Sequence, residues 1–308
     1  MSPPLGFDAR MGAPGRGFKW FSGRRARGYR GAMTRSDDRL GDPAYLRDVQ
    51  YADAANLDAR ARLHRKYGRG DWMDWVAARL PWRDGLRVLE LGCGPGWLWE
   101  AAGRREPAVA LDLTLTDLSP GMVDEAVGRA RGAGPGWTVR GQTADASALP
   151  FADGSFDVVV ACHMLYHLPH PALGVGEIAR VLAEDGLALI ATNGRENLAA
   201  LFALRAEVWP GAPVDPVSWR FGIETGGPML EEAFAELALE RYDDDLVAAD
   251  PADVVAYITS SPPGAGANLD ELERLEAAAR AAFARGGGAM KIGKDTGLFT
   301  CRRPRTNG

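Results

Sequence analysis

The stretch VLELGCGPG, residues 88–96, places three glycines within five positions directly behind an apolar run. Such a turn lets a ligand approach the backbone where a side chain would block it. Its G-x-G-x-G spacing differs from the G-x-G-x-x-G fingerprint of dinucleotide-binding turns, and the acid Glu90 stands just before it. A carboxylate there repels a pyrophosphate, so the turn favours a cationic ligand, such as a sulfonium or ammonium compound, over NAD.

Histidines form the second chemical cluster. Three of the four in the chain, His163, His167 and His170, fall within the stretch CHMLYHLPH. An imidazole with its ordinary pKa near ~6.5 can take a proton from an acceptor hydroxyl at neutral pH, and we predict this role for His167, with Tyr166 orienting the acceptor. His170, between two prolines, is predicted to be a turn residue. A zinc site built from Cys162, His163 and His167 is the alternative, but we expect no metal.

The segments around these motifs alternate between two hydrophobic periods. Short apolar runs predict strands at 86–91, 108–118, 137–142, 156–162, 187–192 and 237–244, and a late strand in GLFTCRR that could pair antiparallel. Helical patterns fall between them, including one that begins at a Ser119 cap with Pro120 in its first turn and one that ends at Gly186. Strands and helices that alternate in this way form a parallel sheet covered on both faces, in which ligands bind at the carboxyl ends of the strands.

In this order, the motifs resemble those of the class I S-adenosylmethionine-dependent methyltransferases, in particular the small-molecule, type 11-like branch. The resemblance is carried by four ordered blocks across residues 86–192: VLELGCGPG, LTDLSPGMVDEA, GQTADASALPFADGSFDVVVACHMLYHLP and EIARVLAEDGLALIAT. It implies a doubly wound, seven-stranded, mostly parallel Rossmann-like sheet with helices on both faces, and S-adenosylmethionine as the cofactor.

The resemblance assigns cofactor binding to residues at and near the strand ends: Glu90, Gly92, Cys93, Gly94, Gly96, Asp117, Leu118, Met122, Asp145, Ala146 and His163. The glycines would lie beneath the methionine part of the cofactor, with Glu90 near its amino group. Asp117 would accept both ribose hydroxyls, a role for which Asp112 is the alternative. Asp145 would take the adenine amino group next to a backbone amide, and the apolar members would flank the adenine or the ribose.

Three regions are predicted along the chain. Residues 1–35 carry eight Lys and Arg against a single acid, a net charge of +7 (8 − 1), without a helical or strand period. This composition predicts a disordered leader, with Met33 opening the working protein. Residues 43–82 are expected to form a helical lid, and residues 83–305 the methyltransferase domain. A cap rich in aromatic residues is expected as an insertion at about 195–235.

The expected activity is methyl transfer to a small molecule, to a hydroxyl of an apolar or aromatic natural product of secondary metabolism. N- or C-methyl transfer is the alternative, and a nucleic-acid methyltransferase that uses the basic arm is a further one. Without that arm the chain carries −12 (−5 − 7), which repels a phosphate backbone, and no N-P-P-[YFW] loop for base flipping follows the fourth strand. A cofactor-binding partner that transfers nothing is the third class.

Composition favours a globular protein of the cytoplasm. The chain is 46% hydrophobic and 25% charged, which is ordinary for a packed domain. Its three cysteines are too few and too scattered for a disulfide framework, and no apolar run reaches the ~18 residues of a membrane helix or forms a signal core. We therefore expect a cytoplasmic enzyme without membrane partners. The sequence leaves open whether the protein forms a homodimer.

Overall fold

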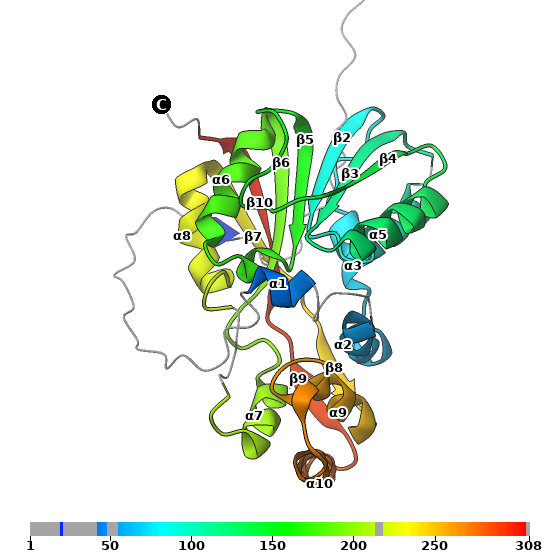
Figure 1. Cartoon of the computed structure of the whole chain (residues 1–308), viewed down its shortest axis with the longest axis vertical. Coiled ribbons are helices and arrows are strands. Elements are labelled where there is room, and N and C mark those ends of the chain that lie inside the picture. Colours follow the sequence, from blue (N-terminus) through cyan, green and yellow to red (C-terminus); the bar gives the residue numbers. More distant parts are fainter. Residues whose placement is uncertain (1–18, 21–41, 48–54, 107, 213–217, 306–308) are drawn as a thin grey trace, which may run out of the picture.

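The computed structural model describes residues 19–20, 42–47, 55–106, 108–212 and 218–305. Two layers follow one another along the long axis of the molecule (Figure 1). A twisted β-sheet with helices on both faces forms one layer. A smaller group of helices with a two-stranded ribbon forms the other.

Seven long strands form the main sheet, in the order β7-β10-β6-β5-β2-β3-β4. Their bounds are Phe234–Arg241 (β7), Thr296–Pro304 (β10), Leu182–Asn193 (β6), Phe156–Cys162 (β5), Leu86–Leu91 (β2), Leu111–Asp117 (β3) and Thr138–Thr143 (β4). Neighbouring strands from β6 to β4 run parallel, whereas β10 is antiparallel to both β6 and β7. The predicted seven-stranded, mostly parallel sheet is confirmed, including its late antiparallel strand.

Helices cover both faces of this sheet. One face packs against α3 (Trp72–Ala77), α4 (Trp97–Arg105) and α5 (Pro120–Ala133), and the other packs against α6 (Pro171–Val181) and α8 (Ile223–Ala233). Because β5 and β6 are covered on both sides, their sequences contain continuous apolar runs at 158–161 and 187–191 instead of alternating patterns. Burying one Val- or Leu-sized side chain contributes about 1.5–3 kcal/mol, so these strands hold the site rigidly in place.

The ends of two helices test the capping predictions. The Ser119 hydroxyl accepts a hydrogen bond from the Met122 amide, and Pro120 is the first residue of α5, as predicted. The helix predicted to end at Gly186 is wrong in its end point, because α6 stops at Val181. Strand β6 begins at the next residue, Leu182, which pairs with Phe156, the first residue of β5. Residues 182–186, which the helical pattern also fits, therefore belong to the strand.

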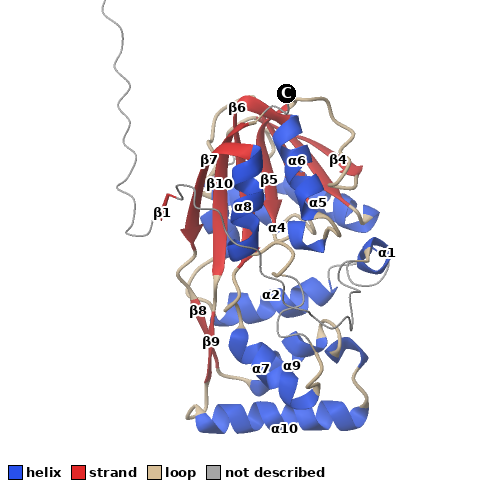
Figure 2. Ribbon diagram, turned by 90° about the vertical axis from the view of Figure 1, so that its left-hand side faces the viewer, coloured by secondary structure: helices blue, strands red, loops and turns tan. Residues whose placement is uncertain are grey.

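The second layer is built around one apolar core. It comprises α2 (Ala55–Tyr67), α7 (Ala199–Val208), α9 (Pro251–Thr259), α10 (Leu269–Arg285) and the ribbon of β8 (Asp245–Ala248) and β9 (Met290–Gly293). We call this group the helical layer. Leu63 of α2 is fully buried in its core. In Figure 2, α2 lies between the sheet and the other helices of the layer.

The helical layer is assembled differently from the predicted cap. Of residues 195–235, α7 joins the layer, but α8 lies on the sheet, where Ile223 and Leu230 are buried in the sheet core. Apart from α2 and α7, the layer comes from residues 245–293, between β7 and β10. The predicted lid at 43–82 divides in the same way, since α2 joins the layer while α3 packs against α4 on the sheet.

Only Lys19 and Trp20 of the predicted leader at 1–35 belong to the described residues. They form β1 at the edge of the sheet, antiparallel to β7. The other residues of that segment lie outside the described part of the chain. Among the residues that the structure describes, no helix is long and apolar enough to cross a membrane.

Candidate functional site

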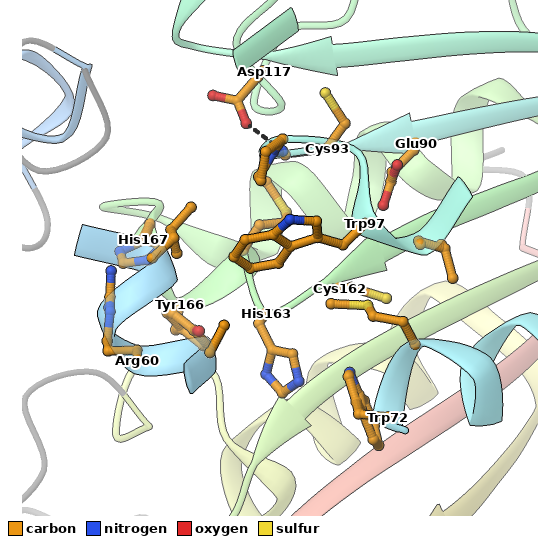
Figure 3. Close-up of a pocket in the computed structure, with 18 of the residues that line it drawn as sticks. Arg60, Trp72, Glu90, Cys93, Trp97, Asp117, Cys162, His163, Tyr166 and His167 are labelled. Atoms are coloured by element: carbon orange, nitrogen blue, oxygen red, sulfur yellow. Dashed lines mark hydrogen bonds between the residues drawn. The ribbon is translucent and has the colours of Figure 1, made fainter. Parts of the chain in front are cut away.

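A cavity of about 890 Å³ lies at the carboxyl ends of the parallel strands, against the helical layer. Its walls come from both layers, with the glycine turn after β2 and the histidine loop after β5 on the sheet side and α2 on the other (Figure 3). All but one of the predicted cofactor and acceptor residues line it. The exception is Gly96.

Close packing explains two of the three glycines in the turn. Gly92 and Gly96 have φ angles of +61° and +81°, which favour glycine. A Cβ at Gly92 would meet the Met164 side chain at 2.6 Å, and a Cβ at Gly96 would meet the Ala126 backbone of α5 at 2.7 Å. Gly96 is therefore required for the approach of α5 to the turn, and the structure does not place it at the cavity.

Gly94 is the glycine that faces open space. Its φ is +50°, and the nearest atom to a Cβ built there is Leu57 Cδ1 of α2, at 3.9 Å. The turn around it is held from both sides. The Gly94 amide donates to Asp117 (3.0 Å), and Arg129 of α5 donates from Nε to the Pro95 carbonyl (2.9 Å). The backbone at Gly94 is thus fixed beside room for a ligand.

Asp117 ends β3 and joins the turn to its own strand. One of its oxygens accepts from the Gly94 amide and the other from the Ser119 amide, both at 3.0 Å. Burial raises the pKa of Asp117, while these amides act to lower it. Each carboxylate oxygen has a second lone pair, so both can still accept hydroxyls from the cavity. Asp112, the alternative ribose residue, is instead ion-paired with Arg140 and does not line the cavity.

Glu90 is the buried acid of the site. Its side chain is 3% exposed and accepts a hydrogen bond from Trp99 Nε1 at 2.6 Å. Within the described residues no lysine, arginine or histidine forms an ion pair with it. Burial raises its pKa to about 8. A buried carboxyl without a cationic partner is suited to a positively charged ligand, which would stabilise its ionised form.

The predicted adenine end lies after β4. Asp145 is exposed at the cavity mouth, where one of its oxygens accepts from the amide and the hydroxyl of Ser147, at 2.8 and 2.7 Å. Its other oxygen makes no hydrogen bond within the described residues. Ala146 and Met122 are buried, and together with Leu118 they give this end of the cavity an apolar wall.

The histidine loop presents two different imidazoles. His163 directly follows β5 with a φ of +55°, and its amide donates to the Ala191 carbonyl at 3.0 Å. Burial lowers its pKa to about 4, so the ring is uncharged at neutral pH and is a poor proton acceptor. His167 ends the single 3₁₀ turn Leu165–His167, with its ring 4.7 Å from the Tyr166 ring. In Figure 3, His167 and Arg60 of α2 lie on the same side of the cavity.

The structure also bears on the zinc alternative. Among the described residues, no three His, Cys, Asp or Glu side chains are grouped so that they could hold a metal ion. Burial raises the pKa of the Cys162 thiol well above its usual value, which disfavours the thiolate that zinc binds. His170 is exposed and directly precedes α6, which agrees with the predicted turn position.

Several cavity residues were not found from the sequence: Arg60, His64, Trp72, Trp97, Asn193, Asn197 and Lys294. Trp97 directly follows the glycine turn, so its position next to the first motif was an available signal. The others lie on α2, on α3 and near the ends of β6 and β10, where no motif marks them. Long-range packing of the two layers brings them together.

A parallel sheet with a glycine turn, an acid ending the next strand and a cavity over both defines an α/β protein of the nucleoside-binding type. A family model described as "Methyltransferase domain" matches residues 89–190. The malonyl-[acyl-carrier protein] O-methyltransferase of Halorhodospira halophila is 31% identical over 207 residues, which are 64% of this chain and 67% of that protein. The chain belongs to the class I S-adenosylmethionine-dependent methyltransferases, and S-adenosylmethionine is its cofactor.

Two further relatives match shorter parts of the chain. The 27-O-demethylrifamycin SV methyltransferase of Amycolatopsis mediterranei is 39% identical over 113 residues, 37% of this chain and 40% of that protein. A ubiquinone biosynthesis O-methyltransferase of Psychrobacter arcticus is 36% identical over 121 residues, 39% of this chain and 46% of that protein. The chain therefore spans less than half the length of these two relatives.

Solved structures share the fold. The YcgJ protein of Bacillus subtilis superposes with a TM-score of 0.52 at 20% identity, over 75% of this chain and 97% of that one. Phosphoethanolamine N-methyltransferase 2 of Haemonchus contortus, solved with S-adenosyl-L-methionine, superposes with a TM-score of 0.51 at 16% identity, over 85% of this chain and 60% of that one. The predicted Rossmann-like methyltransferase fold is confirmed.

Proposed function

We propose that this protein transfers a methyl group from S-adenosylmethionine to a hydroxyl oxygen of a small, largely apolar or aromatic molecule. One observation carries the proposal. A single cavity contains both the acids and the glycine turn of the cofactor end and the Tyr166–His167 pair. Two of the three relatives named above are O-methyltransferases by name, one of them of ubiquinone biosynthesis, and the third is a 27-O-demethylrifamycin SV methyltransferase. A cytoplasmic location belongs to the same proposal, and the three unpaired cysteines agree with it.

Cofactor binding is assigned to four features of the cavity. In the proposed complex, Asp117 accepts the ribose hydroxyls and Glu90 faces the positively charged part of the ligand. Gly94 leaves room for the ligand against the backbone, and Asp145 offers its unused oxygen to the adenine amino group. S-adenosylmethionine supplies a methyl group that is activated by a positively charged sulfur.

The acceptor side needs a base and a dry, well-aligned pocket. His167 is assigned the role of the base that removes the proton from the acceptor hydroxyl, because burial keeps His163 uncharged and weakly basic. Tyr166 packs its ring against His167 and limits the orientations of the imidazole. The helical layer forms one wall of the cavity, and correct alignment of two reactants can lower a barrier by as much as ~7–11 kcal/mol.

Product analysis with simple phenols tests the proposal. Purified protein is incubated with S-adenosylmethionine and a panel of naphthols and catechols, and methyl ethers are sought by mass spectrometry. We expect an O-methyl product whose rate of formation falls by about 10²–10⁴-fold in His167→Gln, while the affinity for S-adenosylhomocysteine is retained. His170→Gln is the matched control and should keep the rate. If only amines or carbon nucleophiles are methylated, or His167→Gln is fully active, oxygen-directed base catalysis is wrong.

A further inference from the structure

A group of hydrogen-bond donors lies at the end of the cavity formed by β6, β10 and α3. Asn193 is the last residue of β6, Asn197 precedes α7, Lys294 lies between β9 and β10, and Trp72 begins α3. All four line the cavity. We call them the donor recess.

Asn197 is oriented by the backbone beside it, and Asn193 contacts the side chain of Thr296. Asn197 is 8% exposed, and its Oδ1 accepts from the Asp295 amide (3.1 Å) and from the Thr296 hydroxyl (3.3 Å). Because the Asp295 backbone N–H can only donate, its contact identifies the Asn197 atom that it meets as the side-chain oxygen. The Thr296 hydroxyl also lies 3.0 Å from Asn193 Oδ1, and its one proton can be donated to either asparagine oxygen. Neither side-chain nitrogen donates a hydrogen bond to any described residue.

Trp72 adds a further donor to the recess. Its indole Nε1 is buried and has no hydrogen-bond partner in the described part of the chain. The ring packs 5.3 Å from His163 and 5.2 Å from Tyr242, and Lys294 Nζ lies 4.8 Å from that same tyrosine ring. Trp72, the histidine loop and the β10 end of the recess are therefore neighbours. A buried donor without a partner costs about 1–3 kcal/mol, so a ligand that accepts from the recess recovers that cost.

The charges of the four recess residues favour a neutral ligand group, and the further cation Arg60 of α2 lines the cavity outside the recess. Lys294 is 6% exposed on its side chain and is paired with the buried Asp244 at 2.9 Å. His163 and His64 are both uncharged at neutral pH, since burial lowers their pKa values to about 4 and about 3. The remaining donors are neutral amide and indole N–H groups. Such donors match a carbonyl oxygen, whereas a carboxylate would call for an unpaired positive charge.

The order of the strands places the recess away from the residues assigned to the ribose and the adenine. Asp117 ends β3 and Asp145 follows β4, on one side of the glycine turn after β2. Asn193 ends β6, which is two strands away on the other side, or about 10 Å at the usual strand spacing of ~4.8 Å. The residues assigned to ribose and adenine therefore leave the β6–β10 end of the cavity to a second molecule.

We propose that the donor recess is a subsite for the methyl acceptor, in which a neutral carbonyl oxygen of the acceptor receives hydrogen bonds from the Asn193 and Asn197 amides, with Trp72 as a further donor. The inference rests on the proposed function, because it requires a small acceptor in the same cavity. It narrows the acceptor to hydroxylated molecules that carry a ketone or quinone-type oxygen at some distance from the reacting hydroxyl.

A matched pair of probes tests the subsite. A hydroxytetralone and the hydroxytetralin that lacks its carbonyl differ by that oxygen alone, and calorimetry gives their affinities for the protein saturated with S-adenosylhomocysteine. We expect the tetralone to bind about 5–10-fold more tightly to the wild type, the range of one well-formed hydrogen bond. Asn197→Asp keeps the oxygen that holds residues 295 and 296 but replaces the donor by an acceptor, so it should abolish the preference. Trp72→Phe keeps the ring packing and should reduce it.

Two control variants distinguish the loss of a donor in the recess from a general effect of the same substitution. Asn268→Asp makes the same chemical change at the distant N-cap of α10, and Trp75→Phe makes the same ring change beside Trp72 at a residue that does not line the cavity. Both should keep the wild-type preference. Thermal unfolding checks that all four variants are folded.

Three results would overturn the inference: equal or undetectable binding of the two probes to the wild type, a preference that survives in Asn197→Asp, or a loss of S-adenosylhomocysteine affinity in that variant. The last result would assign the recess to the cofactor. Because binding is measured without turnover, the test is separate from the proposed function. A carbonyl preference without O-methylation contradicts only the proposed function, and O-methylation without the preference contradicts only the subsite.

Discussion

Asp117 connects the glycine turn to the neighbouring strand, so its removal tests the cofactor site at a single residue. We expect Asp117→Ala to weaken S-adenosylmethionine binding by about 2 kcal/mol or more, because hydrogen bonds to a charged group contribute ~1.5–3 kcal/mol each. Calorimetry measures the loss. Asp112→Ala, on the same strand but paired with Arg140 outside the cavity, is the matched control and should bind normally. Equal losses in both variants would contradict the assignment.

Glu90 makes the stability of the ligand-free protein depend on pH. Its pKa rises from an ordinary 4.5 to about 8 in the folded state, chiefly through burial, so the folded protein holds this proton more tightly than the unfolded chain. This contribution is fully present below pH ~4.5 and is lost as pH rises through about 8. Glu90→Gln keeps an oxygen for Trp99 and cannot ionise. Its unfolding free energy relative to wild type should therefore increase with pH, by up to about 1.4 kcal/mol per pH unit between these values.

Denaturant unfolding at pH 5, 7 and 9 measures that difference. A constant gap between Glu90→Gln and the wild type across these values would show that the carboxyl is ionised in the fold, with a cationic partner or water beside it. Added S-adenosylmethionine should reduce this difference in unfolding free energy at high pH, because its positive charge stabilises the ionised carboxylate of the wild type.

The residues of the glycine turn show how far sequence reasoning reaches at this scale. The spacing and the preceding acid predicted a turn that receives a ligand, and Gly94 and Glu90 line the cavity as expected. The pattern could not distinguish Gly94 from Gly96, because both have positive φ angles. What separates them is the neighbour: Gly96 meets α5, whose distance from the turn is set by the packing of α4 and α5.

At the scale of elements, α2 belongs to the helical layer and also forms a wall of the cavity. Leu63 is buried in the core of the layer, and Lys66 and Tyr67 both donate to Asp253 of α9, at 2.6 and 2.7 Å. On its other side, the Arg65 guanidinium lies 5.0 Å from the Trp97 ring beside the glycine turn. The helix therefore transmits the position of the layer to the cofactor end of the site.

Leu63→Ala tests this connection. Removing a fully buried leucine typically costs about 2–5 kcal/mol, and here the loss should fall on the helical layer. We expect hydrogen exchange to increase in α2, α7 and α9 but not in β2 or β5, together with weaker cofactor binding. Leu269→Ala, at an exposed position on α10, is the control and should change neither. Uniform loss of protection over the sheet would mean that the two layers unfold as one unit.

Element order was predictable where each element is defined by a local pattern, as for α5, β5 and the antiparallel β10. The layer that each helix joins was not predictable from such a pattern. The amphipathic period of α8 shows that one face is buried, but not that the sheet, rather than α7, covers it. The helical layer is built from chain segments on either side of β7, so its core depends on contacts between residues far apart in the sequence.

At the scale of the whole molecule, the described residues of the basic N-terminal segment, Lys19 and Trp20, do not line the cavity. These two residues pair with the outer strand β7, and among the described residues those that line the cavity begin at Leu46. A chain that begins at Met33 should therefore bind S-adenosylhomocysteine with wild-type affinity and unfold within a few degrees of the full chain. A chain that also lacks residues 33–47 loses the buried Leu46 and should be less active on the same phenol.

The net charges make the outcome informative about the competing nucleic-acid function. Removing residues 1–32 deletes seven positive charges and one negative charge, and so takes the chain from −5 to −11 (−5 − 6). A protein of that charge should not bind DNA or RNA at physiological salt. If the shortened chain keeps both cofactor binding and methyl transfer to a phenol, the cavity alone is sufficient for the activity. If it keeps cofactor binding but loses methyl transfer, the segment takes part in holding the acceptor, and the boundary predicted at Met33 is wrong.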